Sequence, residues 1–332
     1  MSGSVVMFAV PSLHDIGPVE ADKVARITAA LDARLELYHC LFDADLSRSG
    51  QIGAARAQEV IQQRVVSAQR GLERSAERLR TRGIPVGTSV RWDYPVYEGI
   101  VRQVLRHRPQ LLVAQSGRHG RLARLVPSHT DWKLIETCPC PLLLLKTRRS
   151  YGKAPLLVAA VDPGHAHDKP AALDERILES AVRLSGALSG RLLVFHARTP
   201  WDEAIRADPE LRDLPEYRDE QIHRAYVAQV HTRVLKLAER HDVARSQVHI
   251  EDGHAAETLP RYAKQRKADL IVMGAVSRSR LRRAFIGHTA ERVLDALDSD
   301  VLILKPPGFH TAVRRESTHL VRRAEPRTRL IW

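Results

Sequence analysis

The chain of 332 residues carries a formal net charge of +13, and 44% of its residues are hydrophobic but only 5% are aromatic. That length suits two domains of roughly 150 residues better than one. No apolar run approaches the ~18 residues of a membrane span, so membrane insertion is not expected. Three cysteines are too few for a disulfide framework, which favours a reducing compartment and predicts a cytoplasmic location.

Apolar runs alternate with amphipathic segments along the first part of the chain. The apolar spacing predicts a strand at Val5–Val10, a helix at Asp22–Ala33, a strand at Leu35–Cys40, a long helix from Ala54 to near Gly83, a strand at Val86–Trp92 and a helix at Glu98–Arg106. The first strand ends at Pro11-Ser12, where a loop is expected.

The second part of the chain repeats this order. It predicts a strand at Leu156–Val161, a helix at Ile177–Leu188, a strand at 191–196, a long helix through Tyr226 and Leu237, and a strand at Val248–Glu251, with Asp252 and Glu257 matching Asp93 and Glu98. Strands that alternate with helices imply a mostly parallel sheet covered on both faces. Each part is therefore expected to be an open α/β layer fold with about five strands.

An internal duplication explains the repeated order. Residues 110–146 align without a gap to residues 269–305, at a constant offset of 159. The matches include two strand positions, an Arg-Leu pair, an Arg, a His-Thr pair and a Leu-Lys strand end: Leu111 and Leu270, Val113 and Val272, Arg121-Leu122 and Arg280-Leu281, Arg124 and Arg283, His129-Thr130 and His288-Thr289, Leu145-Lys146 and Leu304-Lys305. Chance rarely produces such a register, so the chain consists of two halves that are copies of one domain.

The domain boundaries follow from the repeat. We expect one domain at 1–147, a second at 154–307 and a basic tail at 308–332, with the short polar link Thr147–Lys153 holding the two domains together.

These elements, the strand endings LLLLK and VLILK, and the Gly-containing loop after residue 273 resemble the universal stress protein family over about residues 4–147 and 155–306. The tandem layout is most similar to its E-type subgroup. The resemblance implies an α/β fold of two tandem flavodoxin-like or Rossmann-like domains, of the adenine nucleotide alpha hydrolase-like type, each with an open parallel sheet. It also implies that the last strands, Leu142–Leu145 and Val301–Leu304, pair across an internal pseudo-two-fold axis, which would copy the family's dimer within one chain. Many members of the family bind ATP without a known turnover.

The loop of nucleotide-binding members reads G-x2-G-x9-G-[S/T], and the second half keeps part of it. Gly274 and Gly287 match two glycines, Ser277 replaces the other, and His288 with Thr289 follows. The first half has Gln115, Arg118, Ser128 and His129 at these positions, and larger side chains there would fill the space that glycine leaves for phosphate. Two arginines, Arg278 and Arg280, would offset phosphate charge, or else form a solvated face.

The family's first strand commonly ends in an Asp near the adenosine. The second half has Asp162 before Pro163, whereas the first half has Val10 before Pro11. A carboxylate at the carboxyl end of a strand can accept hydrogen bonds from a ribose or adenine. The second half is therefore expected to hold the nucleotide, unless these residues only relieve turn strain and cap a helix.

Other candidate groups favour structural roles. The His-Thr pairs recur in both halves, so Thr130 and Thr289 are expected to cap helices. Histidines at strand ends and in loops lack the partners of a zinc site, so no metal is predicted. The pair Cys138-Pro-Cys140 is interpreted as two small residues before a buried strand.

The predicted function is that of a non-catalytic stress-response binding or regulatory protein, with ATP or another phosphate ligand in the second half. One alternative is a nucleic-acid-binding protein, because residues 306–332 hold six Arg against two Glu, although no recognition motif supports it. Another is a slow ATP hydrolase, although no catalytic phosphate loop or nucleophile elbow occurs. The sequence leaves open whether the protein forms a homodimer.

Overall fold

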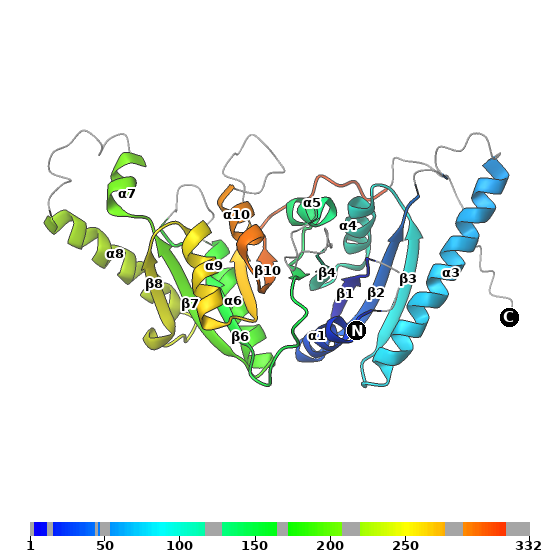
Figure 1. Ribbon diagram of the computed structural model, residues 1–332, viewed down its shortest axis with the longest axis horizontal. Helices are drawn as coiled ribbons and strands as arrows, with labels where there is room; N and C mark the ends of the chain where they lie inside the picture. The colour runs from blue at the N-terminus through cyan, green and yellow to red at the C-terminus, as the bar shows by residue number, and fades with distance from the viewer. Residues whose placement is uncertain are drawn as a thin grey trace.

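The computed structural model describes residues 3–11, 16–43, 46, 54–116, 128–164, 172–207, 220–275 and 288–316. Its strands form one ten-stranded sheet in the order β3-β2-β1-β4-β5-β10-β9-β6-β7-β8, with helices on both faces (Figure 1). The strands are β1 (Val5–Ala9), β2 (Arg34–Leu41), β3 (Val86–Trp92), β4 (Leu111–Gln115), β5 (Leu142–Leu145), β6 (Leu156–Ala160), β7 (Arg191–Arg198), β8 (Val248–Asp252), β9 (Leu270–Gly274) and β10 (Asp300–Leu304).

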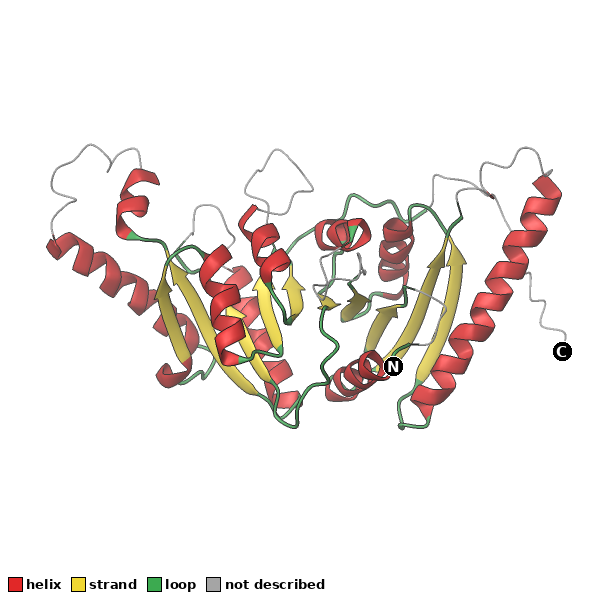
Figure 2. Cartoon of the chain, in the orientation of Figure 1, coloured by secondary structure: helices red, strands yellow, loops and turns green. Residues whose placement is uncertain are grey.

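The helices alternate with these strands (Figure 2). They are α1 (Pro18–Ala30), α3 (Ala54–Arg80), α4 (Val96–His107), α5 (His129–Thr137), α6 (Ala172–Ala187), α7 (Trp201–Ala207), α8 (Glu220–Glu239), α9 (Ala255–Arg266) and α10 (His288–Ala296), with a 3-10 turn η2 (Arg245–Gln247) before β8. The sequence pattern did not predict α7, and it placed the start of α1 too late, because Pro18 opens that helix in its first turn.

Each half of the sheet has the Rossmann-like order 3-2-1-4-5, with every pair inside a half parallel. The expected α/β class with open parallel sheets is therefore confirmed. The halves meet at β5 and β10, which pair antiparallel with Leu144 opposite Val301, Leu143 opposite Leu302 and Leu142 opposite Ile303. The predicted pairing of the last strands across a pseudo-two-fold axis is thus present within one chain.

The internal repeat is visible in the strand register. Gln115 pairs with Leu145 in the first half, and Gly274 pairs with Leu304 in the second. The helices α5 and α10 have the same length and begin at His129 and His288. The offset of 159 residues therefore relates equivalent positions from β4 to β5 and from β9 to β10.

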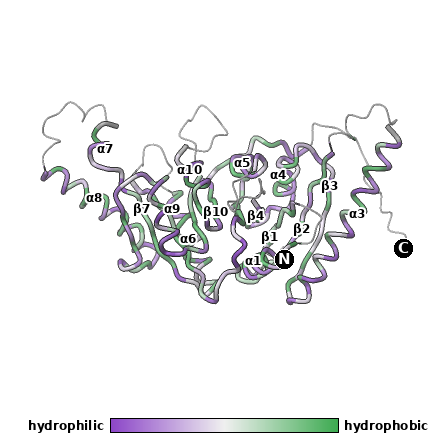
Figure 3. The backbone as a smooth tube through the Cα atoms, viewed as in Figure 1, coloured by the Kyte–Doolittle hydropathy of each residue, from purple (hydrophilic) through white to green (hydrophobic). Residues whose placement is uncertain are grey.

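Two layers of core side chains cover the two faces of the sheet and run across the junction between the halves. One layer contains Leu143 and Leu302, and the other contains Leu144 and Val301. Successive strand residues point to opposite faces, so the apolar strand ends contribute to both layers, and hydrophobic colour concentrates along the strands in Figure 3. The two halves consequently share a core at their junction.

A buried carboxylate joins the halves at the start of β10. Asp300 accepts a 2.6 Å hydrogen bond from Lys23 on α1 and a 2.8 Å hydrogen bond from the hydroxyl of Tyr151 in the link. It also accepts 2.8 Å bonds from the backbone amides of Lys146 and Thr147. The side chains of Lys23 and Asp300 are both fully buried. This cluster fixes the link against both halves, consistent with a short connection rather than a free tether.

Two buried lysines follow β5 and β10 at equivalent positions. Lys146 crosses to the other half and donates to the carbonyl oxygens of Leu294 and, at 2.7 Å, Leu297 at the end of α10. Lys305 lies differently, because its ammonium makes a long 3.4 Å contact with the carbonyl of Ala275 and lies 4.9 Å from the ring centre of Phe309. Burial lowers the pKa of each lysine to about 8.

Lys146 should make stability depend on pH. The folded pKa is about 8 and the ordinary value is 10.5, so the folded state binds fewer protons between these values and stability rises with pH there. The whole shift corresponds to about 3 kcal/mol. We expect the free energy of unfolding of wild type, measured in urea, to increase relative to that of Lys146→Met as the pH rises from about 8 to about 10. A difference that stays constant with pH would contradict this assignment.

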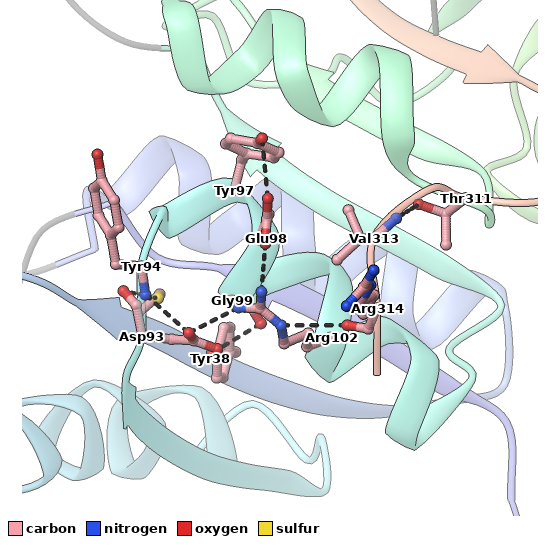
Figure 4. A network of polar contacts seen from close by, with 11 residues as sticks. Tyr38, Asp93, Tyr94, Tyr97, Glu98, Gly99, Arg102, Thr311, Val313 and Arg314 are labelled. Atoms are coloured by element: carbon pink, nitrogen blue, oxygen red, sulfur yellow. Dashed lines mark hydrogen bonds and ion pairs between the residues drawn. The ribbon is translucent and has the colours of Figure 1, made fainter. Parts of the chain in front are cut away.

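The first described part of the basic tail returns to the first half of the sheet. Arg102 on α4 is buried, and it binds the carboxylate of Asp93 at 2.7 Å, the carboxylate of Glu98, and the carbonyl oxygen of Arg314 at 3.3 Å (Figure 4). Val313 packs against the core layer that contains Leu144 and Val301. Residues 308–316 therefore link the end of the second half to α4.

One helix cap differs from the expectation. In α5 the cap is Ser128, whose hydroxyl accepts from the amide of Asp131 at 3.2 Å, while the Asp131 carboxylate accepts from the amide of Ser128 at 2.6 Å. This reciprocal pair is a capping box. The prediction that Thr130 caps this helix was wrong, because Thr130 lies inside the first turn.

Candidate functional site

The candidate site lies at the carboxyl ends of β6 and β9 in the second half. These two strands are neighbours in the sheet, and the chain leaves them toward opposite sides, with β7 and β8 beyond β6 and β10 beyond β9. In open α/β sheets such a switch point leaves a crevice where ligands bind. Asp162 follows β6 and Gly274 ends β9, so the structure brings these two predicted residues to the same edge.

Asp162 is held by its backbone while its carboxylate stays accessible. Its amide donates to the carboxylate of Asp174 on α6 at 3.0 Å, and 41% of its side chain is exposed. The imidazole of His196 lies 3.9 Å from the Asp162 carboxylate and makes a 3.0 Å hydrogen bond with the carbonyl of Val161. The exposed carboxylate can therefore accept further hydrogen bonds at the carboxyl end of β6.

Arg198 at the end of β7 is a site residue that the sequence pattern did not reveal. It binds the Asp252 carboxylate through Nε at 2.6 Å and Nη2 at 2.8 Å, and this pair raises the pKa of Arg198. Its buried Nη1 has no hydrogen-bond partner among the described residues. Nearby, Trp201 stacks against His223 and contacts Tyr226, with ring centres 5.7 Å and 5.0 Å apart.

The strand register corrects two alignments made from sequence. Val10 and Val161 lie beside His39 and His196, and both valine carbonyls contact these histidines, so Pro11, not Val10, occupies the position of Asp162. The sequence pattern did not reveal this one-residue shift, because the two strands end in similar apolar runs.

The same correction applies at the next strand pair. Leu41 pairs with Trp92, whereas Arg198 pairs with Asp252, so Asp252 matches Trp92 rather than Asp93. Phe42 packs at this edge of the first half against Trp92 and Tyr94, with ring centres 6.0 Å and 4.2 Å apart. Apolar and aromatic groups thus replace the ion pair and the carboxylate of the second half.

Gly274 has a packing role that is independent of any ligand. A Cβ atom at this position would come within 2.7 Å of the Cδ2 of Leu173 and 3.4 Å of the Cδ1 of Ile177, both on α6. Gln115 at the equivalent position of the first half donates to the carboxylate of Glu20 on α1 at 3.1 Å. Substituting Gly274 would disturb the core, so it is a poor test of ligand binding.

Most of the predicted loop lies outside the described residues, namely Ser277, Arg278, Arg280 and Gly287, as does Arg118 of the first half. The backbone of His288 and Thr289 forms the start of α10, and Thr289 is exposed.

In the part of the chain that the structure describes, no three side chains of His, Cys, Asp or Glu gather in a way that could hold a metal ion. None of the helices in the same ranges has the length and apolar character needed to cross a bilayer.

The fold is a tandem α/β arrangement, and Asp162 and Gly274 lie at the switch point of its second half. A family model described as the universal stress protein family matches residues 16–146 and 165–305. The chain belongs to the universal stress protein family, with two tandem domains.

Relatives and solved structures agree with this membership. Universal stress protein E of Escherichia coli K12 is 27% identical over 296 residues, covering 87% of this chain and 88% of the relative. The relative of that name from Photorhabdus laumondii is 25% identical over 294 residues, covering 88% and 90%. A functionally unknown protein from Pseudomonas aeruginosa PAO1 superposes with a TM-score of 0.69 at 26% identity, covering 91% of this chain and 92% of that one. The resemblance to the E-type subgroup is thus confirmed.

Proposed function

We propose that this universal stress protein acts as a non-catalytic stress-response binding protein that takes an adenine nucleotide, ATP in particular, in the second half. The observation that carries the proposal is the polar edge of Asp162 and Arg198, which the first half replaces with Pro11 and Leu41. The three cysteines are free thiols, in keeping with a reducing compartment, and we place the protein in the cytoplasm.

The chemistry of the edge suits the nucleoside part of the ligand. The Asp162 carboxylate would accept hydrogen bonds from ribose hydroxyls or an exocyclic amine, and Arg198 Nη1 would donate to a ring nitrogen or phosphate oxygen. Buried donors without a partner are costly, so a ligand acceptor at Nη1 would be stabilising. The phosphates would reach the loop that contains Ser277, Arg278, Arg280, Gly287, His288 and Thr289.

Calorimetric titration of the full-length protein with ATP tests the proposal. We expect one ATP per chain, and a loss of about tenfold or more in affinity for Asp162→Ala and for Arg198→Leu, since each removes a charge-assisted hydrogen bond. Arg198→Leu copies the residue of the first half. Glu179→Ala, an exposed carboxylate on α6, is the control and should bind as wild type. Equal affinity in all four proteins, or no heat of binding in wild type, would refute the proposal.

The same samples separate the two alternatives. A slow ATP hydrolase would accumulate ADP, and Asp162→Ala would abolish that turnover, whereas a binding protein returns ATP unchanged. A nucleic-acid-binding protein would bind oligonucleotides with an affinity that falls steeply with salt and is lost when residues 308–332 are deleted.

A further inference from the structure

Two of the three thiols lie side by side directly before β5. Cys138 ends α5 and Cys140 follows one proline later, with their sulfur atoms 3.5 Å apart. The Sγ of Cys138 is also 3.5 Å from the carbonyl oxygen of Cys140. Cys138 is buried and Cys140 is half-buried, so the pair can be approached from the side of Cys140.

The fold itself does not need thiols here. The repeat places Leu297 and Ser299 of the second half at the positions of Cys138 and Cys140. Leu297 is buried in the core, and the Ser299 hydroxyl donates to the carbonyl of Ala268 at 2.8 Å. A leucine and a serine therefore satisfy the same packing in the same fold, and the paired thiols call for another explanation.

The surroundings distinguish the two thiols chemically. The hydrogen bond from Cys140 and the Lys305 ammonium lower the pKa of Cys138, although burial opposes them. The same hydrogen bond and burial raise the pKa of Cys140.

We propose that Cys138 and Cys140 form a reversible intramolecular disulfide in response to hydroperoxides. The sulfur atoms need only close from 3.5 Å to a bond of about 2.05 Å. Because Cys140 leads directly into β5, this modification site adjoins the junction between the halves.

The reaction balances with one hydroperoxide. The Cys138 thiolate attacks a peroxide oxygen, the O–O bond breaks, and the alkoxide or hydroxide that leaves takes up a proton. Cys140 then attacks the sulfenic sulfur of Cys138, the S–O bond breaks, and the departing hydroxide takes the thiol proton of Cys140 to form water. Two thiols are oxidised to one disulfide, and the peroxide is reduced to an alcohol, or water, plus water.

Mass spectrometry of the reduced full-length protein tests this after exposure to hydrogen peroxide and alkylation under denaturing conditions. We expect a mass loss of about 2 Da before alkylation, one alkylated thiol instead of three, and recovery of all three with dithiothreitol. Cys40→Ser should still form the disulfide, because Cys40 is buried in the first half and burial raises its pKa to about 12.

Two variants carry the residues that the second half has at the equivalent positions, so both are expected to fold. Cys138→Leu and Cys140→Ser should each lose the 2 Da change. Three alkylated thiols after peroxide, or the same mass loss in Cys140→Ser, would overturn the proposal.

Discussion

Replacing Asp300 by Asn is expected to lower the free energy of unfolding by about 3–5 kcal/mol. The substitution keeps the shape of the side chain but removes the charge that faces the buried Lys23 ammonium at 2.6 Å. It also weakens the acceptor for the Tyr151 hydroxyl and for the amides of Lys146 and Thr147. A buried charge left without its partner costs more than the pair contributed. Urea unfolding measures the loss, and hydrogen exchange should show faster opening of β5 and β10.

Controls separate charge from packing at this junction. Asp298→Asn changes an exposed carboxylate two residues earlier and should alter stability by no more than about 0.5 kcal/mol. The double variant Lys23→Met with Asp300→Leu removes both charges, so it should recover part of the loss, and the remainder would belong to the unpaired amides and hydroxyl. If Asp300→Asn unfolds at the same urea concentration as Asp298→Asn, the cluster does not hold the halves together.

Arg102→Leu should have an effect of similar size, about 3–5 kcal/mol, because it leaves two carboxylates without their buried partner. Arg102 is 1% exposed and joins Asp93, Glu98 and the carbonyl of Arg314. The described start of the tail loses its polar attachment in this variant. We therefore expect lower stability in urea together with faster tryptic cleavage after Arg314.

The internal repeat supplies a matched control for Arg102. Arg261 occupies the equivalent position on α9, but its side chain is 55% exposed and pairs with Glu251 at 3.0 Å. Exposed ion pairs contribute little, so Arg261→Leu should change stability by less than about 1 kcal/mol and leave cleavage of the tail unaffected. Equal losses of stability in the two variants would show that the contribution of Arg102 to stability does not depend on its burial between α4 and the tail.

The resemblance to the universal stress protein family predicted the pairing of the last strands. Periodicity, strand endings and the internal repeat were enough to predict the α/β class and the tandem organisation from sequence. These features depend on local patterns, because buried parallel strands need continuous apolar runs and helices need an apolar stripe. The gapless match around residues 110–146 and 269–305 also indicated that Lys146 and Lys305 are equivalent. The resemblance to the universal stress protein family, in which the first strand commonly ends in an Asp, identified the carboxylate of Asp162 as a candidate.

Only the tertiary structure decided which side chains meet. Three contacts join residues that are far apart in the chain: Lys23 with Asp300, Arg102 with Arg314, and Arg198 with Asp252. No local sequence pattern encodes such contacts. The same holds for the one-residue corrections that place Pro11 opposite Asp162 and Trp92 opposite Asp252, since register depends on hydrogen bonds between strands. Sequence periodicity determines which face of an element is buried, whereas the partners of buried polar groups depend on how the packed elements satisfy one another's charges.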